Sequence, residues 1–153
     1  MKIEMYTRDD CVFCERAKEY LLENNIAYRQ YNIPRDISRD DVILLFPDAK
    51  MLPIVVIDEV YIGGYEQLKN RIVGILTKRS ETVLALKTAP QIIKFKKLDG
   101  SERTIRCTLE ESLLPPVKGN AIQNIEVLAV WDLENEGWRS FRVENIISIE
   151  RAN

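Results

Sequence analysis

The sequence predicts a mixed α/β domain over residues 1–88, followed by a small all-β barrel of the SH3 or Sm type over residues 89–153. Two observations support this division. In the first part, apolar residues at helical spacing alternate with short β-branched runs, whereas beyond residue 90 they alternate with polar residues as in strands. The change follows Thr88-Ala89-Pro90, which is typical of the end of a connector.

The α/β domain is expected to open with a strand, a helix, a second strand and a second helix. Residues 2–6 alternate apolar and charged side chains as a strand does, and residues 12–25 carry apolar side chains at helical spacing. A second short strand is expected at residues 27–33. Ser38 is a typical N-cap, so the next helix is expected to begin there and to end before Pro47.

The same domain is expected to close with two paired strands and a third helix. Residues 53–58 form a β-branched run, and residues 61–62 form its short partner. Gly63-Gly64 then provides a turn into a helix over residues 66–77. Beyond this helix the pattern weakens into a connector, and a helix that continues to Leu86 is the alternative.

The barrel is expected to contain two hairpins and a final strand. Asp99-Gly100 is a two-residue hairpin signal, because both residues tolerate positive φ. A second hairpin is expected around Asn135-Glu136-Gly137, and a loop with Pro and Gly over residues 113–120. The strands are expected at residues 92–98, 102–109, 125–133, 138–143 and 146–150.

Composition excludes several classes of function. The 153 residues include 22 basic and 24 acidic side chains and no histidine. The balanced charge argues against general attraction to nucleic acid or lipid, and the lack of histidine excludes Ser-His-Asp and Cys-His catalysis. The first residues lack the apolar run of a signal peptide, and no segment is long enough to span a membrane. Three cysteines are a poor framework for a secreted domain, so we expect a reducing, cytoplasmic compartment.

The chemistry is expected at Cys11 and Cys14, where the first strand ends and the first helix begins. A helix N-terminus stabilises a thiolate, so Cys11 is the expected nucleophile. Cys14 lies one turn later on the same side and is the expected resolving thiol. Asp9 and Asp10 oppose this activation, and either one capping the helix is an alternative. A zinc site is the other alternative, but only Cys107 remains as a further thiol and there is no histidine.

These features resemble the glutaredoxins of the thioredoxin-like superfamily over residues 1–78. The resemblance rests on three motifs in the family's order and spacing, which are Tyr6-Thr7-Arg8-Asp9-Asp10-Cys11-Val12-Phe13-Cys14, Leu52-Pro53 followed by residues 54–58, and Ile62-Gly63-Gly64-Tyr65. It implies a thioredoxin-like fold and a dithiol oxidoreductase that reduces protein or mixed disulfides. Glutathione would be the reductant, no metal is expected, and ribonucleotide reductase is an expected electron acceptor if the gene is viral.

The same resemblance implies a set of residues that bind glutathione. Pro53 would be a cis-proline opposite the dithiol, and the backbone of Leu52 would pair with glutathione or a protein substrate. Arg8 would contact the glycine carboxylate. The whole expected set is Arg8, Phe13, Leu52, Pro53, Gly64, Tyr65 and Glu66. Four positions depart from the family pattern, namely Val12, Phe13, Met51 and Gln67.

The barrel carries fewer signals. Cys107 alternates with apolar residues and is expected to be a buried, inert thiol, with a redox partnership with Cys11 as the alternative. Aromatic residues of the closing hairpin are expected to build the core; they are Trp131, Trp138 and Phe141. Nearby arginines can contact phosphates, but glutamates are interspersed, so we expect no nucleic-acid partner; the residues are Arg106, Arg139, Arg142, Glu134, Glu136 and Glu144. The region weakly resembles an SH3-like, distantly WYL-like domain of tailed-phage proteins.

Two functions follow from the sequence. The leading one is a glutathione-linked thiol-disulfide oxidoreductase that acts as a monomer on disulfide-bearing proteins, with no membrane partner, in the cytoplasm or in the host cytoplasm if phage-encoded. The alternative is a redox-switched binding or regulatory protein, in which the barrel recognises a protein or nucleic-acid partner.

Overall fold

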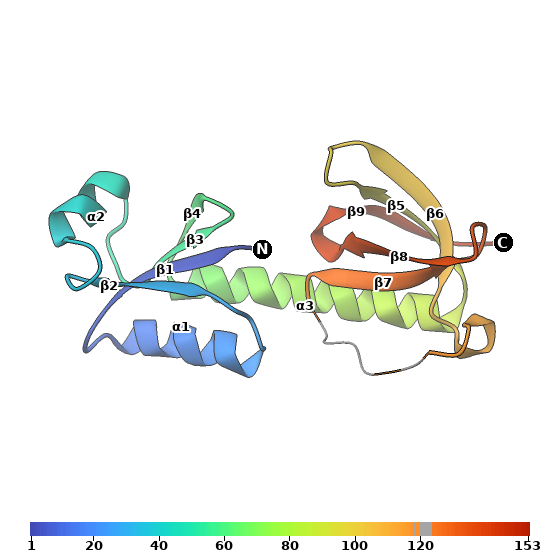
Figure 1. Cartoon of the computed structure of the whole chain (residues 1–153), viewed down its shortest axis with the longest axis horizontal. Helices are drawn as coiled ribbons and strands as arrows, with labels where there is room; N and C mark the ends of the chain where they lie inside the picture. Colours follow the sequence, from blue (N-terminus) through green and yellow to red (C-terminus); the bar gives the residue numbers. More distant parts are fainter. Residues whose placement is uncertain (118, 120–123) are drawn as a thin grey trace. The chain divides into compact units, whose positions relative to one another are not determined.

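A computed structural model describes residues 1–117, 119 and 124–153, which divide into two compact units, Met1–Val73 and Gly74–Asn153 (Figure 1). The division falls inside the long helix α3, Tyr65–Thr88. The first unit is a mixed α/β structure and the strands after α3 form an all-β sheet, so the predicted fold classes are confirmed. The domain limits 1–88 and 89–153 stay a prediction.

The first unit is built on a four-stranded sheet with the order β2-β1-β3-β4. Strand β1 (Ile3–Arg8) pairs in parallel with β2 (Arg29–Ile33) and antiparallel with β3 (Ile54–Ile57). Strand β4 (Val60–Gly63) pairs antiparallel with β3 at the edge. Every second side chain of β1 is buried, while β3 is buried at all four positions, as expected for a β-branched central run.

Two helices precede α3 in this unit. Helix α1 (Val12–Glu23) runs below β1 and β2 in Figure 1 and buries one side, which includes Cys14. Helix α2 (Arg39–Leu45) begins where the sequence predicts, because Ser38 Oγ accepts a hydrogen bond from the Asp41 backbone N–H at 3.1 Å. The sheet and α1 together fix the loop that carries the two cysteines.

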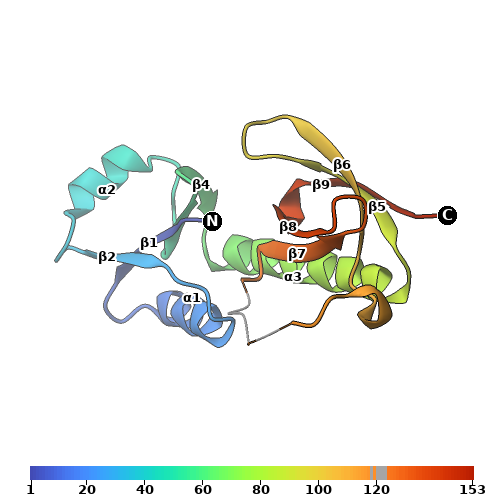
Figure 2. The same cartoon turned by 45° about the vertical axis from the view of Figure 1, so that its right-hand side comes forward.

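The second unit contains a five-stranded antiparallel sheet with the order β8-β7-β6-β5-β9 (Figure 2). Its strands are β5 (Gln91–Lys96), β6 (Glu102–Thr108), β7 (Val127–Asp132), β8 (Gly137–Arg142) and β9 (Ile146–Arg151). The buried core includes Leu86, Ile93, Phe95, Ile105, Cys107, Leu128, Val130, Phe141, Val143 and Ile146. One core therefore joins all five strands to the last turns of α3.

Helix α3 is longer than the predicted 66–77, because it continues to Thr88. Its second half belongs to the second unit, where Leu86 is fully buried. The side chains of Lys78 and Arg79 donate hydrogen bonds to backbone carbonyls of β9 and β7, at 3.1 and 2.6 Å. Polar side chains therefore help to attach this half to the sheet, which explains why the apolar periodicity is weak there.

The first hairpin turn also differs from the prediction. Lys97 and Ser101 pair across it, with the Lys97 N–H donating to the Ser101 carbonyl at 2.7 Å. The Gly100 N–H donates to the Lys97 carbonyl at 3.0 Å, and Gly100 has a φ of +89°. The turn is thus longer than the predicted two residues, and glycine occupies its left-handed position. Of the predicted 113–120 loop, residues 118 and 120 lie outside the described residues.

Candidate active site

The two cysteines lie where β1 gives way to α1, as predicted. Cys11 and Cys14 form a disulfide, and their Cα atoms are 5.2 Å apart. Cys11 is partly exposed, whereas Cys14 is fully buried. An incoming thiol or disulfide can therefore reach the sulfur of Cys11 but not that of Cys14.

Cys11 itself is the N-cap of α1. Its Sγ accepts a hydrogen bond from the Cys14 backbone N–H at 3.2 Å, and its carbonyl accepts one from the Glu15 N–H at 3.1 Å. Asp9 is engaged elsewhere, because its Oδ1 accepts a hydrogen bond from Asn32 Nδ2 at 3.0 Å. Asp10 has a φ of +57°. The cap is therefore the nucleophilic sulfur, and not an aspartate as in the alternative.

Leu52 and Pro53 lie opposite the dithiol. The Leu52–Pro53 peptide bond is cis, and the Leu52 carbonyl oxygen is 3.8 Å from Cys11 Sγ. Pro53 is buried at the start of β3, next to a partly buried Leu52. A backbone carbonyl close to the reactive sulfur leaves a polar edge to which an extended substrate can pair.

The glycine turn approaches the same loop from β4. A Cβ atom at Gly64 would stand 3.4 Å from the Pro53 carbonyl oxygen, so glycine permits a close approach of the two segments. Gly63 has a φ of +124°, which strongly favours glycine. The Gly64 N–H donates to Gln67 Oε1 at 2.9 Å, so Gln67 caps the start of α3. The sequence singled out Gln67 only as a departure from the family pattern.

The remaining expected residues lie at the rim. Phe13 is 48% exposed, and its ring centroid is 6.2 Å from that of Tyr65. The Arg16 guanidinium lies 5.3 Å from the Phe13 centroid, a cation–π contact that sequence reasoning missed. Arg8 and Glu66 are exposed, at the end of β1 and in the first turn of α3. The roles predicted for these residues in binding glutathione stay predictions.

The structure agrees with some of the predictions made for residues of the second unit and not with others. Burial, with the nearby charge of Asp132, raises the pKa of the Cys107 thiol to about 12, so this thiol is a poor nucleophile. Phe141 is buried and its ring stacks on Phe95 at 4.8 Å. Trp138 is 41% exposed and packs edge-on against Trp131, so its predicted place in the core is wrong. An outer position on the edge strand β8 accounts for that exposure.

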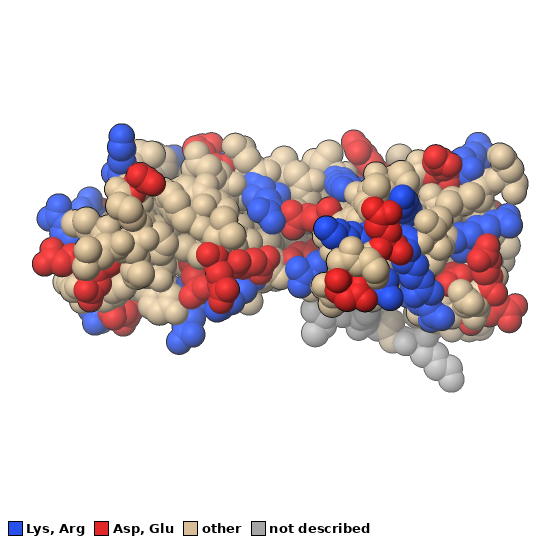
Figure 3. Space-filling model, turned by 90° about the horizontal axis from the view of Figure 1, so that it is seen from above, with Lys and Arg blue, Asp and Glu red and all other residues tan. Residues whose placement is uncertain are grey.

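Acidic and basic side chains both occur on the face in Figure 3, and much of the surface over the first unit is uncharged. None of the described helices is both long enough and apolar enough to cross a membrane. Over residues 1–117, 119 and 124–153, no group of three or more His, Cys, Asp or Glu side chains could hold a metal ion.

Two family models match the chain. The glutaredoxin model matches residues 3–62, and WYL_2, described as an Sm-like SH3 beta-barrel fold, matches residues 81–147. The two matches fall on either side of residues 63–80. They agree with the two sheets of the structure.

Individual relatives match the first part of the chain. A probable glutaredoxin of Synechocystis is 32% identical over 68 residues, which cover 44% of this chain and 77% of the relative. Glutaredoxin 3 of Escherichia coli K12 is 26% identical over 66 residues, covering 43% and 80%. Among solved structures, glutaredoxin 1 from Francisella tularensis, complexed with cacodylate, is 30% identical, covers 50% of this chain and 96% of its own, and has a TM-score of 0.41.

Proposed function

The chain belongs to the glutaredoxin family through its first domain and is a thiol-disulfide oxidoreductase, and we propose that glutathione supplies its electrons. Its substrates in this proposal are protein disulfides and mixed disulfides. The observation that carries the dithiol chemistry of this proposal is the unequal exposure of the two cysteines, with Cys11 accessible at a helix N-terminus and Cys14 buried behind it.

The reaction proceeds in two exchanges. In the reduced protein, the Cys11 thiolate attacks a substrate disulfide, forms a mixed disulfide and releases one substrate sulfur, which takes a proton from water. Cys14 then loses its proton and attacks Cys11 Sγ, so the Cys11–Cys14 disulfide forms and the second substrate thiol leaves. The N–H of Cys14, 3.2 Å from Cys11 Sγ, favours negative charge on that sulfur before the attack.

Two glutathione molecules restore the dithiol. The thiolate of the first attacks Cys11, the sulfur that solvent reaches, and releases Cys14 as a thiol. The second attacks the glutathione sulfur of that mixed disulfide, which frees Cys11 and gives oxidised glutathione. Two electrons pass to the enzyme, in agreement with the two that each substrate disulfide takes. A reducing, cytoplasmic compartment and a monomeric protein are part of the proposal.

The glutathione site is proposed to surround Cys11. The Leu52 carbonyl, 3.8 Å from Cys11 Sγ, supports pairing of the glutathione backbone with Leu52 next to Pro53. The cationic Arg8, and the start of α3 at Gly64, Tyr65 and Glu66, are proposed to receive the two carboxylates, with Phe13 at the rim. Arg8→Ala is expected to raise the KM for glutathione several-fold. Arg29→Ala, an exposed change at the other end of the β1–β2 pair, is expected to leave it unchanged.

A coupled assay tests the proposal. It contains glutathione, glutathione reductase, NADPH and a small mixed disulfide, and compares the wild type with Cys11→Ser, Cys14→Ser and the control Cys107→Ala. Cys11→Ser is expected to abolish turnover. Cys14→Ser is expected to retain turnover of the glutathione mixed disulfide but to lose reduction of a protein disulfide. Cys107→Ala is expected to behave as the wild type.

A second set of assays tests the identity of the reductant independently of the dithiol mechanism. Thioredoxin reductase with NADPH replaces glutathione and its reductase, and oxidised ribonucleotide reductase replaces the model disulfide as a narrower candidate substrate. Turnover with thioredoxin reductase alone would contradict the glutathione linkage and leave the dithiol mechanism intact. No turnover with either reductant would overturn both.

A further inference from the structure

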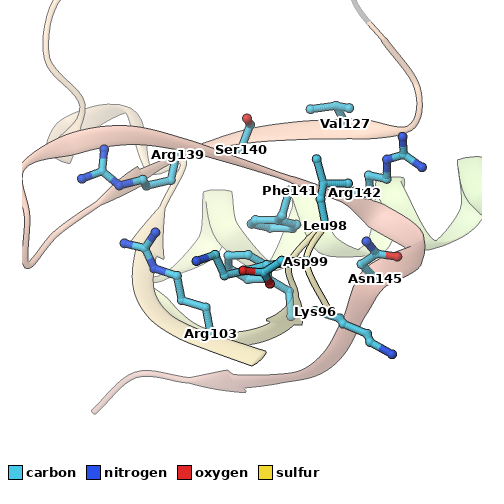
Figure 4. A pocket seen from close by; sticks show the side chains of 12 residues that line it. Lys96, Leu98, Asp99, Arg103, Val127, Arg139, Ser140, Phe141, Arg142 and Asn145 are labelled. Carbon is cyan, nitrogen blue, oxygen red and sulfur yellow. The ribbon is translucent and has the colours of Figure 1, made fainter. Parts of the chain in front are cut away.

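A pocket of about 540 Å³ lies in the second unit, between the hairpin of β5 and β6 and the strands β7 and β8 (Figure 4). Phe95 and Phe141 line its floor with stacked rings, and Leu98 and Val127 add apolar surface. Leu98 is 84% exposed although it is a large apolar side chain. A pocket of this volume is of the size that small organic ligands occupy.

The pocket is lined by many cations. Five basic side chains take part, namely Lys96, Lys97, Arg103, Arg139 and Arg142. Among the described residues that line it, Asp99 is the one carboxylate, and both the backbone N–H and the hydroxyl of Ser101 donate to its Oδ1. The glutamates that the sequence suggested as counter-charges, Glu134, Glu136 and Glu144, are not in the lining. Basic side chains therefore outnumber acidic ones in the pocket lining, although the chain as a whole is nearly neutral.

A buried carboxylate lies close to two of these arginines. Asp132 is 1% exposed, and its Oδ2 lies 3.9 Å from Arg103 Nη2 and 3.9 Å from Arg139 Nε. These distances are too long for hydrogen bonds, so the attraction orients the guanidinium groups without engaging those N–H donors. The Asp132 oxygens accept their hydrogen bonds from the turn, with Oδ1 accepting from the N–H groups of Glu134 and Asn135 and Oδ2 from Asn135 Nδ2.

The donors that remain suit a bound anion. Arg139 Nη1 donates to the Trp138 carbonyl at 3.0 Å, and the other N–H groups of the pair can face a ligand. Figure 4 shows Arg103 and Arg139 at the same end of the pocket, with Arg142 at the opposite end. Planar guanidinium groups bind phosphate by two parallel hydrogen bonds, a geometry that lysine cannot provide.

We propose that this pocket binds a phosphorylated small molecule with an apolar or aromatic body. The phosphates of the ligand lie against Arg103 and Arg139, and its apolar body packs on Leu98 and Phe141. The mixed lining favours such a ligand, because an inorganic ion would leave the apolar floor exposed, and a neutral ligand would leave the excess of basic over acidic side chains around the pocket uncompensated. The inference does not depend on the dithiol reaction.

Calorimetric titration of the full chain with ATP as the probe tests the proposal, at low and at physiological salt. One ATP is expected to bind per chain. Arg103→Gln and Arg139→Gln are each expected to weaken binding about tenfold or more, as loss of a charged hydrogen-bond partner does. Arg106→Gln, on the same strand as Arg103 but outside the lining, is the matched control and is expected to bind as the wild type. Thermal unfolding of each variant checks that the fold is kept.

Three further probes decide the chemistry of the ligand. Inorganic triphosphate and adenosine are each expected to bind at least about tenfold more weakly than ATP, since each lacks one of the two parts. Equal binding of triphosphate and ATP would overturn the apolar part of the proposal. A single-stranded oligonucleotide that binds far more tightly than ATP, with the same loss in Arg103→Gln, would overturn the small-molecule ligand in favour of nucleic acid. Absence of ATP binding at roughly 1 mM, or binding that both arginine variants retain, would overturn the site.

Discussion

The backbone N–H of Cys14 donates a hydrogen bond to the Sγ of Cys11 at 3.2 Å, so the nucleophile of the site is also the N-cap of the helix that carries the resolving cysteine. The helix N-terminus therefore acts on Cys11 in particular. Cys14 lies inside the first turn and is fully buried, which gives it no access to solvent. The two thiols of one short motif thus differ in reactivity because of their positions in the helix.

In the reduced, native protein, the three thiols are expected to be alkylated at rates that follow their accessibility and their reactivity. Cys11 should react first with iodoacetamide at neutral pH, Cys14 much more slowly, and Cys107 only after denaturation, because burial first and Asp132 second raise its pKa to about 12. Mass spectrometry of peptides from timed samples gives the rate at each site, and a urea-denatured sample is the control in which all three react. Native modification of Cys107 as fast as that of Cys11 would contradict the structure.

The dithiol site was predictable because its signals are local. Cys11 and Cys14 are three residues apart at a strand end, and Pro53 and the Gly63-Gly64 turn carry recognisable backbone preferences. The cap formed by Gln67 was not predictable, since a glutamine at that position is also compatible with an exposed side chain. Nor does the sequence show that Asn32 engages Asp9, because this contact joins residues 23 positions apart.

In the second unit, too, contacts between residues distant in sequence could not be predicted. Its strands alternate apolar and polar residues and were predicted, but the pocket depends on how the arginines of β6 and β8 meet around one buried carboxylate. Linear proximity suggested that glutamates would neutralise Arg139 and Arg142. Those glutamates do not line the pocket, and the carboxylate beside Arg139 is that of Asp132. Charge near in sequence is a poor guide to charge near in space.

Two glycines are expected to respond oppositely to alanine. At Gly63, with a φ of +124°, a Cβ would stand 2.7 Å from Gln67 Cγ, so Gly63→Ala should destabilise the protein by about 1 to 3 kcal/mol. Gly74 lies inside α3 and a Cβ there meets nothing within 4 Å, so Gly74→Ala should stabilise by about 0.5 to 1 kcal/mol. Urea unfolding of both variants measures the difference, and a shift in the same direction for both would refute this explanation.

The last turns of α3 are expected to be necessary for the stability of the barrel, because they contribute Leu86 to its core. Leu86 is fully buried in the barrel core, and its carbonyl accepts a hydrogen bond from the Leu109 N–H at 3.1 Å. Leu86→Ala should therefore cost about 2 to 5 kcal/mol of stability, while Leu84→Ala, at a position 69% exposed on the same helix, should cost far less.

Truncation extends this prediction to the domain boundary. A fragment of residues 74–153 retains Leu86, whereas a fragment of residues 89–153 lacks it. The longer fragment is expected to unfold at the higher denaturant concentration, as followed by tryptophan fluorescence. Equal stability of the two fragments would support a boundary at residues 88/89 and would show that the helix adds nothing to the barrel.

Because of Asp132, the stability of the barrel is expected to depend on pH in the acidic range. Burial alone would raise the pKa of Asp132, but hydrogen bonds from Asn135 and Glu134, with the charge of Arg139, outweigh burial and hold the pKa below its ordinary value. The unfolded chain therefore binds a proton at this carboxyl before the folded chain does. The stability that Asp132 contributes is complete above its ordinary pKa of about 3.9 and is lost as the pH falls through the lower folded value.

Asp132→Asn isolates this contribution. The replacement amide keeps an oxygen for the N–H groups of the turn but loses the acceptor of Asn135 Nδ2 and the charge that attracts Arg103 and Arg139. It should therefore cost about 1 to 3 kcal/mol at pH 7. Below the folded pKa the wild-type carboxyl is neutral as well, so the difference in free energy of unfolding should shrink between about pH 5 and pH 2. Urea titrations across this range measure it, with Glu134→Gln, an exposed carboxylate in the same turn, as the control. A difference that stays constant with pH would mean that Asp132 acts through shape and hydrogen bonding alone, and not through its charge.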